Sequence, residues 1–125
     1  RCKIWRMESY RDLIVWQKGI RLVSEIYKLT EKFPKNEIFG LTSQTRRAAV
    51  SIPANLAEGY ARKHRAEYAQ FVKIAFGSGA ELETHLLIAQ NLGFVDKQDV
   101  VEAGALLDEV MRMLNKLSAS LAATP

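Results

Sequence analysis

The amino-acid sequence predicts an all-α protein, an antiparallel up-down-up-down four-helix bundle, and three observations support this prediction. Apolar residues recur at alternating steps of three and four along three long segments, which is the spacing of one helix face. No segment alternates apolar and polar residues with a period of two, so no strand is expected. The chain of 125 residues has only three prolines and seven glycines, and its connectors of about four to seven residues join antiparallel neighbours.

The first helix is expected to begin at a capping box formed by Ser9 and Asp12 and to end before Pro34. It carries two neighbouring apolar stripes. One comprises Val15, Leu22, Ile26, Leu29 and Phe33, and the other comprises Leu13, Trp16, Ile20, Val23 and Tyr27. Together the stripes are wider than packing within one bundle requires. We therefore expect a surplus apolar surface on this helix, which marks an interface.

The second helix is expected over Leu41–Glu58, with Gly59 as its left-handed C-cap. Pro53 lies inside this segment, where it removes a backbone donor and predicts a kink one turn earlier. We expect the side-chain amide of Asn55 to satisfy the carbonyl that Pro53 leaves free. Glu58 would lie unfavourably at the negative end of the helix dipole, so we expect it to have a specific cationic partner.

The third helix is expected from about His64 to Leu92 and ends at Gly93, whereas Asp96 caps a fourth helix that runs to about Leu121. Both have an apolar seam with the 3.5-residue repeat of left-handed knobs-into-holes packing. The first seam is Tyr68, Val72, Ala75, Gly79, Leu82, Leu86 and Ala89. The second is Val100, Ala103, Leu107, Val110, Leu114, Leu117 and Leu121.

A chain of this length forms one domain, which we expect to cover residues 10–121. Residues 1–9 are expected to be disordered, with residues 1–6 ahead of a natural start near Met7, and residues 122–125 are expected to fray. No apolar run approaches the ~20 residues that span a bilayer, and no signal peptide is apparent. The single cysteine, Cys2, excludes an internal disulfide. A cytoplasmic protein without membrane contact is the resulting expectation.

Charge is distributed unevenly along a chain whose net charge is +4. Residues 40–65 hold five basic residues and one acidic residue, whereas residues 66–125 hold four basic and eight acidic residues. Such asymmetry attracts polyanions to one side of a protein. It also suits head-to-tail contacts between subunits, or solubility alone, and the sequence leaves these alternatives open.

Residues for catalytic chemistry are scarce. The two histidines, His64 and His85, lack the Glu-x-x-His spacing of di-iron bundles, so no metal or cofactor is expected. The Gly-Ser-Gly segment at 77–79 lies inside a helix instead of at an anion-binding terminus, and we expect it to allow close helix packing. No catalytic residue is recognisable. His85 is expected to be partly exposed and paired with Glu81.

Adjacent arginines Arg46 and Arg47 point about 100° apart on a helix, so they face different surroundings. One is expected to pair with an acid such as Glu58 or Glu81, because the planar guanidinium group matches a carboxylate. The other is expected to join an exposed basic cluster of Arg62, Lys63 and Arg65. A solvated charged face that binds nothing is the alternative.

Two strings, RRAAVSIPANLAEG at 46–59 and IAFGSGAELET at 74–84, closely resemble the four-helix-bundle family named after proteins encoded in 23S rRNA intervening sequences. The resemblance covers about residues 10–95. It implies a compact up-down bundle that assembles as a ring-like homopentamer. It also implies a relation to the accessory variability determinant protein of diversity-generating retroelements, which binds its reverse transcriptase and nucleic acid.

The resemblance carries no catalytic residue onto this chain. The positions that match the family's signature are Arg46, Arg47, Asn55, Glu58, Gly59, Arg62, Gly77, Ser78 and Glu81. His64 departs from the pattern, because relatives usually have Ser or Thr there, in a capping box with the acid at Glu67. Imidazole is a poorer cap, so the start of the third helix is expected to be weak.

The sequence thus predicts a non-enzymatic homopentameric adaptor that binds RNA or DNA phosphates. The residues expected to contact phosphate are Arg46, Arg47, Arg62, Lys63, Arg65, Lys18 and Arg21. The structural signature comprises Asn55, Glu58, Gly59, Gly77, Ser78 and Glu81. The alternative is a protein-protein interaction scaffold, whose basic residues contact other subunits, a reverse transcriptase or another protein partner, without nucleic acid.

Overall fold

A computed structural model describes residues 9–123 of the protein as an all-α structure, with no strand in that range. Four helices follow one another: α1 Ile14–Thr30, α2 Leu41–Ala61, α3 Arg65–Asn91 and α4 Val101–Ala122. Short 3-10 turns at Tyr10–Asp12 and Lys35–Glu37 precede α1 and α2. The predicted all-α class with four helices is therefore confirmed. Expectations about residues 1–8, including Cys2 and Met7, and about residues 124–125 lie outside the described range.

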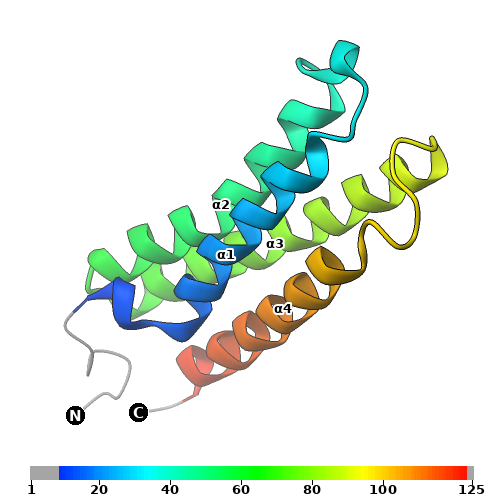
Figure 1. Cartoon of the computed structure of the whole chain (residues 1–125). Helices are drawn as coiled ribbons and strands as arrows, with labels where there is room; N and C mark the ends of the chain where they lie inside the picture. The colour runs from blue at the N-terminus through cyan, green and yellow to red at the C-terminus, as the bar shows by residue number, and fades with distance from the viewer. Residues whose placement is uncertain (1–8, 124–125) are drawn as a thin grey trace.

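The four helices pack around one shared core, in which α2 and α4 each contact both α1 and α3. Figure 1 shows the blue start and the red end of the chain at the same end of the molecule. The α1–α2 and α3–α4 connectors lie together at the opposite end. The edge formed by α1 and α2 therefore lies across the molecule from the edge formed by α3 and α4. None of the described helices is long and apolar enough to cross a membrane.

The core confirms the predicted seams. Every residue of the α3 seam is buried, and in the α4 seam only Val100 and Leu117 are half-buried. One predicted stripe of α1, from Val15 to Phe33, is also buried. The second stripe is half-buried or exposed, and Ile20 and Tyr27 each keep 43% of their surface. The predicted apolar surplus on the first helix therefore lies at the surface.

The ends of α1 differ from the prediction. The capping box forms, since the Ser9 amide donates to Asp12 Oδ2 (3.3 Å) and the Arg11 amide donates to Ser9 Oγ (3.1 Å). It caps the short 3-10 turn instead of α1, which begins at Ile14. At the other end α1 stops at Thr30. The backbone amides of residues 31–33 donate to the carbonyls three residues earlier, which is the 3-10 pattern often found at helix ends.

The predicted C-cap at Gly59 is wrong. α2 continues to Ala61, and the left-handed residue after it is Lys63, with φ 55°. Gly59 is needed for a different reason, because a Cβ atom at this position would lie 2.6 Å from the Cβ of Phe71 on α3. The absence of a side chain lets α2 and α3 approach closely.

Two further expectations are also wrong, one about the carbonyl that Pro53 leaves free and one about the residue that caps α4. The Asn55 amide donates to the Ser51 carbonyl (2.7 Å) and not to the carbonyl one turn before Pro53. Asp96 does not cap α4, which begins later, at Val101. Instead, Asp96 and Asp99 each donate a backbone N–H to the other's carboxylate at 2.9 Å, which closes a turn ahead of α4.

Candidate functional site

Polar side chains at helical spacing meet along the outer surface of α2 and α3. They enclose a hollow of ≈ 350 Å³, the α2–α3 polar groove, lined by Gln44, Arg47, Ala48, Ser51, Ser78 and Glu81. The Ser78 hydroxyl donates to Ser51 Oγ at 2.9 Å, and Asn55 Nδ2 donates to the same oxygen at 2.8 Å. Four residues of the predicted signature, Arg47, Asn55, Ser78 and Glu81, therefore lie at or beside this groove.

Small residues hold α3 close to its neighbours. A Cβ atom at Gly79 would overlap the sulfur of Met111 on α4, so the expected role in close packing is confirmed there. The neighbouring Gly77 differs, since a Cβ atom there would meet nothing within 4 Å. The close packing predicted for the Gly-Ser-Gly segment is therefore confirmed at Gly79. At Gly77 no other part of the described chain lies close enough to require a glycine.

Arg46 is half-buried against α1, and the expectation that one of the two adjacent arginines pairs with an acid such as Glu58 or Glu81 is wrong, since neither does. Its guanidinium carbon lies 4.4 Å from the centroid of the Tyr27 ring, and its Nε donates to Thr30 Oγ1 at 2.8 Å. Nη2 donates to the Tyr27 carbonyl at 3.5 Å. Arg46 therefore fastens α2 to the end of α1 through an aromatic ring and neutral oxygens.

Arg47 is exposed, and within residues 9–123 it makes no ion pair and no hydrogen bond. Its side chain lines the polar groove and also a neighbouring hollow of ≈ 400 Å³ formed with Tyr27, Arg46, Val50 and Ser51. Arg47 is thus the member of the arginine pair that is available to a partner.

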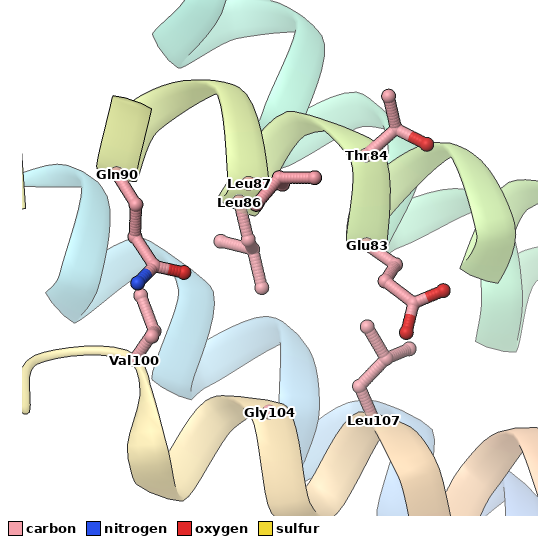
Figure 2. Close-up of a pocket in the computed structure, with 8 residues that line it drawn as sticks. All are labelled: Glu83, Thr84, Leu86, Leu87, Gln90, Val100, Gly104 and Leu107. Atoms are coloured by element: carbon pink, nitrogen blue, oxygen red, sulfur yellow. The ribbon is translucent and has the colours of Figure 1, made fainter. Parts of the chain in front are cut away.

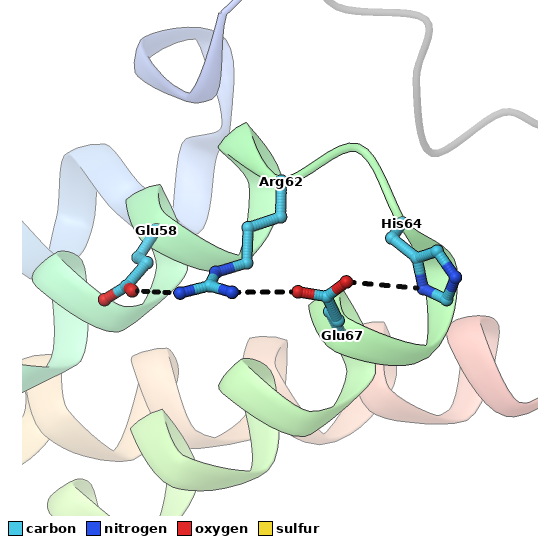
Figure 3. A network of polar contacts seen from close by, with 4 residues as sticks. All are labelled: Glu58, Arg62, His64 and Glu67. Atoms are coloured by element: carbon cyan, nitrogen blue, oxygen red, sulfur yellow. Dashed lines mark hydrogen bonds and ion pairs between the residues drawn. The ribbon is translucent and has the colours of Figure 1, made fainter.

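Arg62 lies at the centre of a network of charged residues between α2 and α3 (Figure 3). Its Nη2 contacts Glu58 Oε2 at 2.8 Å, and its Nη1 contacts Glu67 Oε1 at 2.9 Å. Hydrogen bonds to Glu58 and then Glu67 raise the pKa of Arg62. The specific cationic partner expected for Glu58 is therefore Arg62, one turn away. His64 adds a longer contact, with Nδ1 3.9 Å from Glu67 Oε2, and its side chain does not cap α3.

Arg65 fastens the end of α4. Its Nε donates to the Leu121 carbonyl, and its Nη2 donates to the carbonyls of Ser120 and Ala123, all at 3.0 Å. These carbonyls belong to the last turn of a helix, where no intrahelical donor is present. Lys63 lies beside it with Nζ 4.0 Å from the centroid of the Tyr60 ring. In the predicted basic cluster, Arg62 therefore has charged partners and Arg65 has carbonyl partners within the chain.

The residues of the α2–α3 polar groove and of the Arg62 network all lie in the part of the chain that matches one protein family. The sequence model of the 23S rRNA-intervening sequence protein family matches residues 11–116, which include both diagnostic strings. The chain belongs to this family. No curated protein matches it.

The α1 cations of this family member face acids on α4. Lys18 Nζ lies 3.1 Å from Glu109 Oε2, and Arg21 lines a hollow whose other charged residues are Glu25, Glu102 and Glu109. Arg47 and Arg62 are separated by about 22 Å along α2 at 1.5 Å per residue. The residues predicted to bind phosphate are therefore spread over several surfaces of the chain instead of forming one patch.

His85 differs from expectation in its burial. It is 6% exposed instead of partly exposed, while its predicted pairing with Glu81 is confirmed, with Nε2 3.6 Å from Glu81 Oε2. Its Nδ1 is buried without a hydrogen-bond partner. Across residues 9–123 no three His, Cys, Asp or Glu side chains are grouped to hold a metal ion.

Sequence reasoning missed a groove of mixed polar and apolar lining between α3 and α4, which we call the α3–α4 groove. It encloses ≈ 390 Å³ and is lined by Glu83, Thr84, Leu86, Leu87, Gln90, Val100, Gly104 and Leu107. Figure 2 shows Leu86 pointing from α3 toward α4 between Gln90 and Glu83, with the Glu83 carboxylate close to Leu107. The one sequence signal was Gly104, a glycine inside a helix and off its seam.

Proposed function

We propose that this protein is a non-enzymatic subunit of a ring-like homopentamer, an up-down-up-down bundle that acts as a cytoplasmic adaptor. The observation that supports assembly is the presence of unburied apolar surface on opposite edges of the chain. The α1–α2 edge has Ile20, Tyr27 and Val50 at 41–43% exposure, and the α3–α4 edge has Leu87 at 57% and Val101 at 52%. Apolar surface of this kind marks sites of association.

Charge supports a head-to-tail arrangement of the subunits. The α1–α2 edge presents the unpaired Arg47, whereas the α3–α4 edge presents the exposed Glu83, which makes no ion pair within residues 9–123. Unlike surfaces that complement each other form heterologous contacts, and such contacts close into rings when the rotation between neighbours permits. The mass in solution tests the proposal. Sedimentation should give about five times the chain mass of 14.1 kDa, and a monomer at every concentration would contradict it.

Nucleic-acid binding is a second candidate, supported by the exposed Arg47, which has no acid partner within hydrogen-bonding distance in the described range. Arg62 can contribute as well, because an exposed ion pair contributes little to stability and phosphate can replace a carboxylate. A ring would repeat each cation and add avidity. Labelled RNA and DNA of equal length should bind with an affinity that falls steeply with salt and depends little on sequence. Absence of binding at low salt would exclude this function.

A charge reversal distinguishes the adaptor from a pure scaffold. If Arg47→Glu abolishes RNA binding and leaves the pentamer intact, the nucleic-acid function is supported. If it dissociates the pentamer without changing the RNA affinity, the basic residues serve subunit contacts, or contacts with a protein partner such as a reverse transcriptase. The resemblance to the retroelement accessory protein supports that partner class. Stoichiometric metal in the purified protein would contradict the non-enzymatic assignment.

A further inference from the structure

Phe39 is the most exposed large apolar residue of the described chain. Its surface is 96% exposed, and the preceding Ile38 is 47% exposed. Both lie on the connector between α1 and α2, and we call this pair the Ile38–Phe39 knob. An aromatic ring surrounded by water on nearly all sides contributes nothing to the chain's own core, so its position points to a contact outside the chain.

The connector holds the knob in a fixed turn. The Ile38 amide donates to the Lys35 carbonyl at 3.2 Å, and the Gly40 amide donates to the Glu37 carbonyl at 2.9 Å. Glu37 Oε1 accepts from the first amide of α2, that of Leu41, at 2.9 Å. A side chain presented on an ordered turn loses little conformational freedom when it binds, which favours association.

The α3–α4 groove has the properties of a site for this knob. Its apolar side chains are Leu86, Leu87, Val100 and Leu107, and at ≈ 390 Å³ it falls within the size range of ligand pockets. Gly104 enlarges it, since a Cβ atom there would meet nothing within 4 Å. The exposed Glu83 beside the groove and the exposed Lys35 beside the knob carry opposite charges, and neither makes an ion pair within residues 9–123.

The positions of knob and groove along the bundle are matched. The connector that carries Phe39 and the connector that follows α3 lie at the same end of the molecule (Figure 1). The groove adjoins the second connector, because it is built from the end of α3 and the start of α4. A rotation about an axis parallel to the bundle therefore brings the knob of one copy to the groove of the next without a shift along that axis. Contacts of this kind close into a ring instead of a filament.

We propose that the Ile38–Phe39 knob of one subunit inserts into the α3–α4 groove of a second copy of this chain. This inference rests on the homopentamer proposed above and assigns the residues of its subunit contact. The occupant of the groove is thus a segment of the same protein, recognised by an aromatic ring and a nearby Lys35–Glu83 attraction.

Two variants each remove one side of the contact, the knob or the groove, and neither changes a residue of the core. Phe39→Ser removes the ring, and Gly104→Leu fills the groove with a side chain that meets open space in the monomer. Both should retain full helicity, and Gly104→Leu should melt at a higher temperature than the equally monomeric Phe39→Ser, because leucine favours helix more than glycine does. Both should sediment as monomers at concentrations where the wild type is a pentamer.

Matched controls are Ile14→Ser, which removes an exposed apolar side chain at the other end of α1, and Gly77→Leu, which fills open space on α3 two turns before the groove residue Thr84. Both controls should remain pentameric. Equal dissociation of Gly77→Leu and Gly104→Leu would overturn the assignment of the groove. A pentameric Phe39→Ser would overturn the assignment of the knob.

A mixing experiment tests the pairing itself. Phe39→Ser keeps a groove and Gly104→Leu keeps a knob, so together they should form a 1:1 dimer and nothing larger in native mass spectrometry. A mixture that contains only monomers would overturn the pairing, as would a dimer of either variant alone. A wild-type chain that is monomeric at every concentration would instead reject the homopentamer itself. A wild-type pentamer that both variants preserve would reject this contact alone.

Discussion

Two glycines, Gly59 and Gly77, occupy helices but differ in what surrounds them. An alanine methyl at Gly59 would lie 2.6 Å from the Cβ of Phe71, whereas one at Gly77 would meet open space. We expect Gly59→Ala to lower the free energy of unfolding by about 1–3 kcal/mol through overpacking. Gly77→Ala should raise it by up to about 1 kcal/mol, because alanine favours helix. Urea unfolding measures both, and equal stability of the two variants would show that α2 and α3 are not in close contact at Gly59.

Tyr68 makes stability depend on pH in the alkaline range. Burial raises its pKa to about 12, above the ordinary value of 10.0. Between these values the unfolded chain has lost the tyrosine proton and the folded chain still holds it, so stability falls as pH rises. Tyr68→Phe removes this contribution while keeping the ring that packs edge-on against Tyr60.

From pH 9 to 11.5 the wild type should therefore lose about 1–2 kcal/mol more stability than Tyr68→Phe. Urea unfolding at half-unit steps of pH is the measurement. Parallel pH profiles for the two proteins would show that the Tyr68 hydroxyl titrates alike in the folded and unfolded chains.

Among the helices, α4 has the end most dependent on a distant residue. Arg65 donates to three carbonyls of its last turn, which lie more than fifty residues away in sequence. Removing the guanidinium leaves those carbonyls to water, so Arg65→Ala should destabilise the end of α4 locally by about 1 kcal/mol. Hydrogen exchange of the last amides of α4 should speed up several-fold, while the rest of the core stays protected.

Arg112→Ala is the matched control on the same helix. Arg112 contacts Asp108 one turn away, and both side chains are about two-thirds exposed. An exposed pair of this kind contributes little, so exchange at the end of α4 should remain at the wild-type rate. Equal acceleration in the two variants would show that loss of positive charge, and not the capping of carbonyls, weakens the helix.

The α3–α4 connector is fastened to the α1–α2 connector by an ion pair that responds to acid. Lys32 Nζ lies 2.5 Å from Asp99 Oδ1, and its hydrogen bond, ahead of the backbone bond from Asp96, lowers the pKa of Asp99. The stabilisation is therefore present above the ordinary carboxylate pKa and is lost as pH falls through the lowered value. Lys32→Gln should move the pKa of Asp99 upward in an NMR titration. An unchanged pKa would mean that Lys32 does not hold the carboxylate in solution.

Helix seams could be predicted from sequence because each depends on the periodicity within one segment. The α3 seam from Tyr68 to Ala89 follows from spacing alone. Helix ends could not be predicted as well, because competing local turns decide them. The Asp96–Asp99 turn resembles a helix cap in sequence yet precedes α4.

The contacts of the candidate site also divide into those that follow from spacing within one helix and those that depend on how helices pack. Arg62 and Glu58 are one turn apart, so their pairing follows from helical spacing. The carbonyl partners of Arg65 at the end of α4 do not, since they depend on how helices distant in sequence meet. Gly59 likewise signalled a constraint, but the neighbour that causes it, Phe71, lies on another helix.

For the whole molecule, assembly and stability are coupled if the apolar stripe of α1 is covered by a neighbouring subunit. A ring that dissociates on unfolding gains stability with concentration by mass action, so the melting temperature of the wild type should rise over a hundredfold increase in protein. Ile20 is 43% exposed within the stripe, and Ile20→Asp would place a charge in the subunit contact. This variant should melt at a temperature that is independent of concentration. Ile14→Ser, outside the stripe and 51% exposed, should keep the wild-type dependence. A concentration-dependent Ile20→Asp would place this stripe outside the contact, whatever the mass of the assembly.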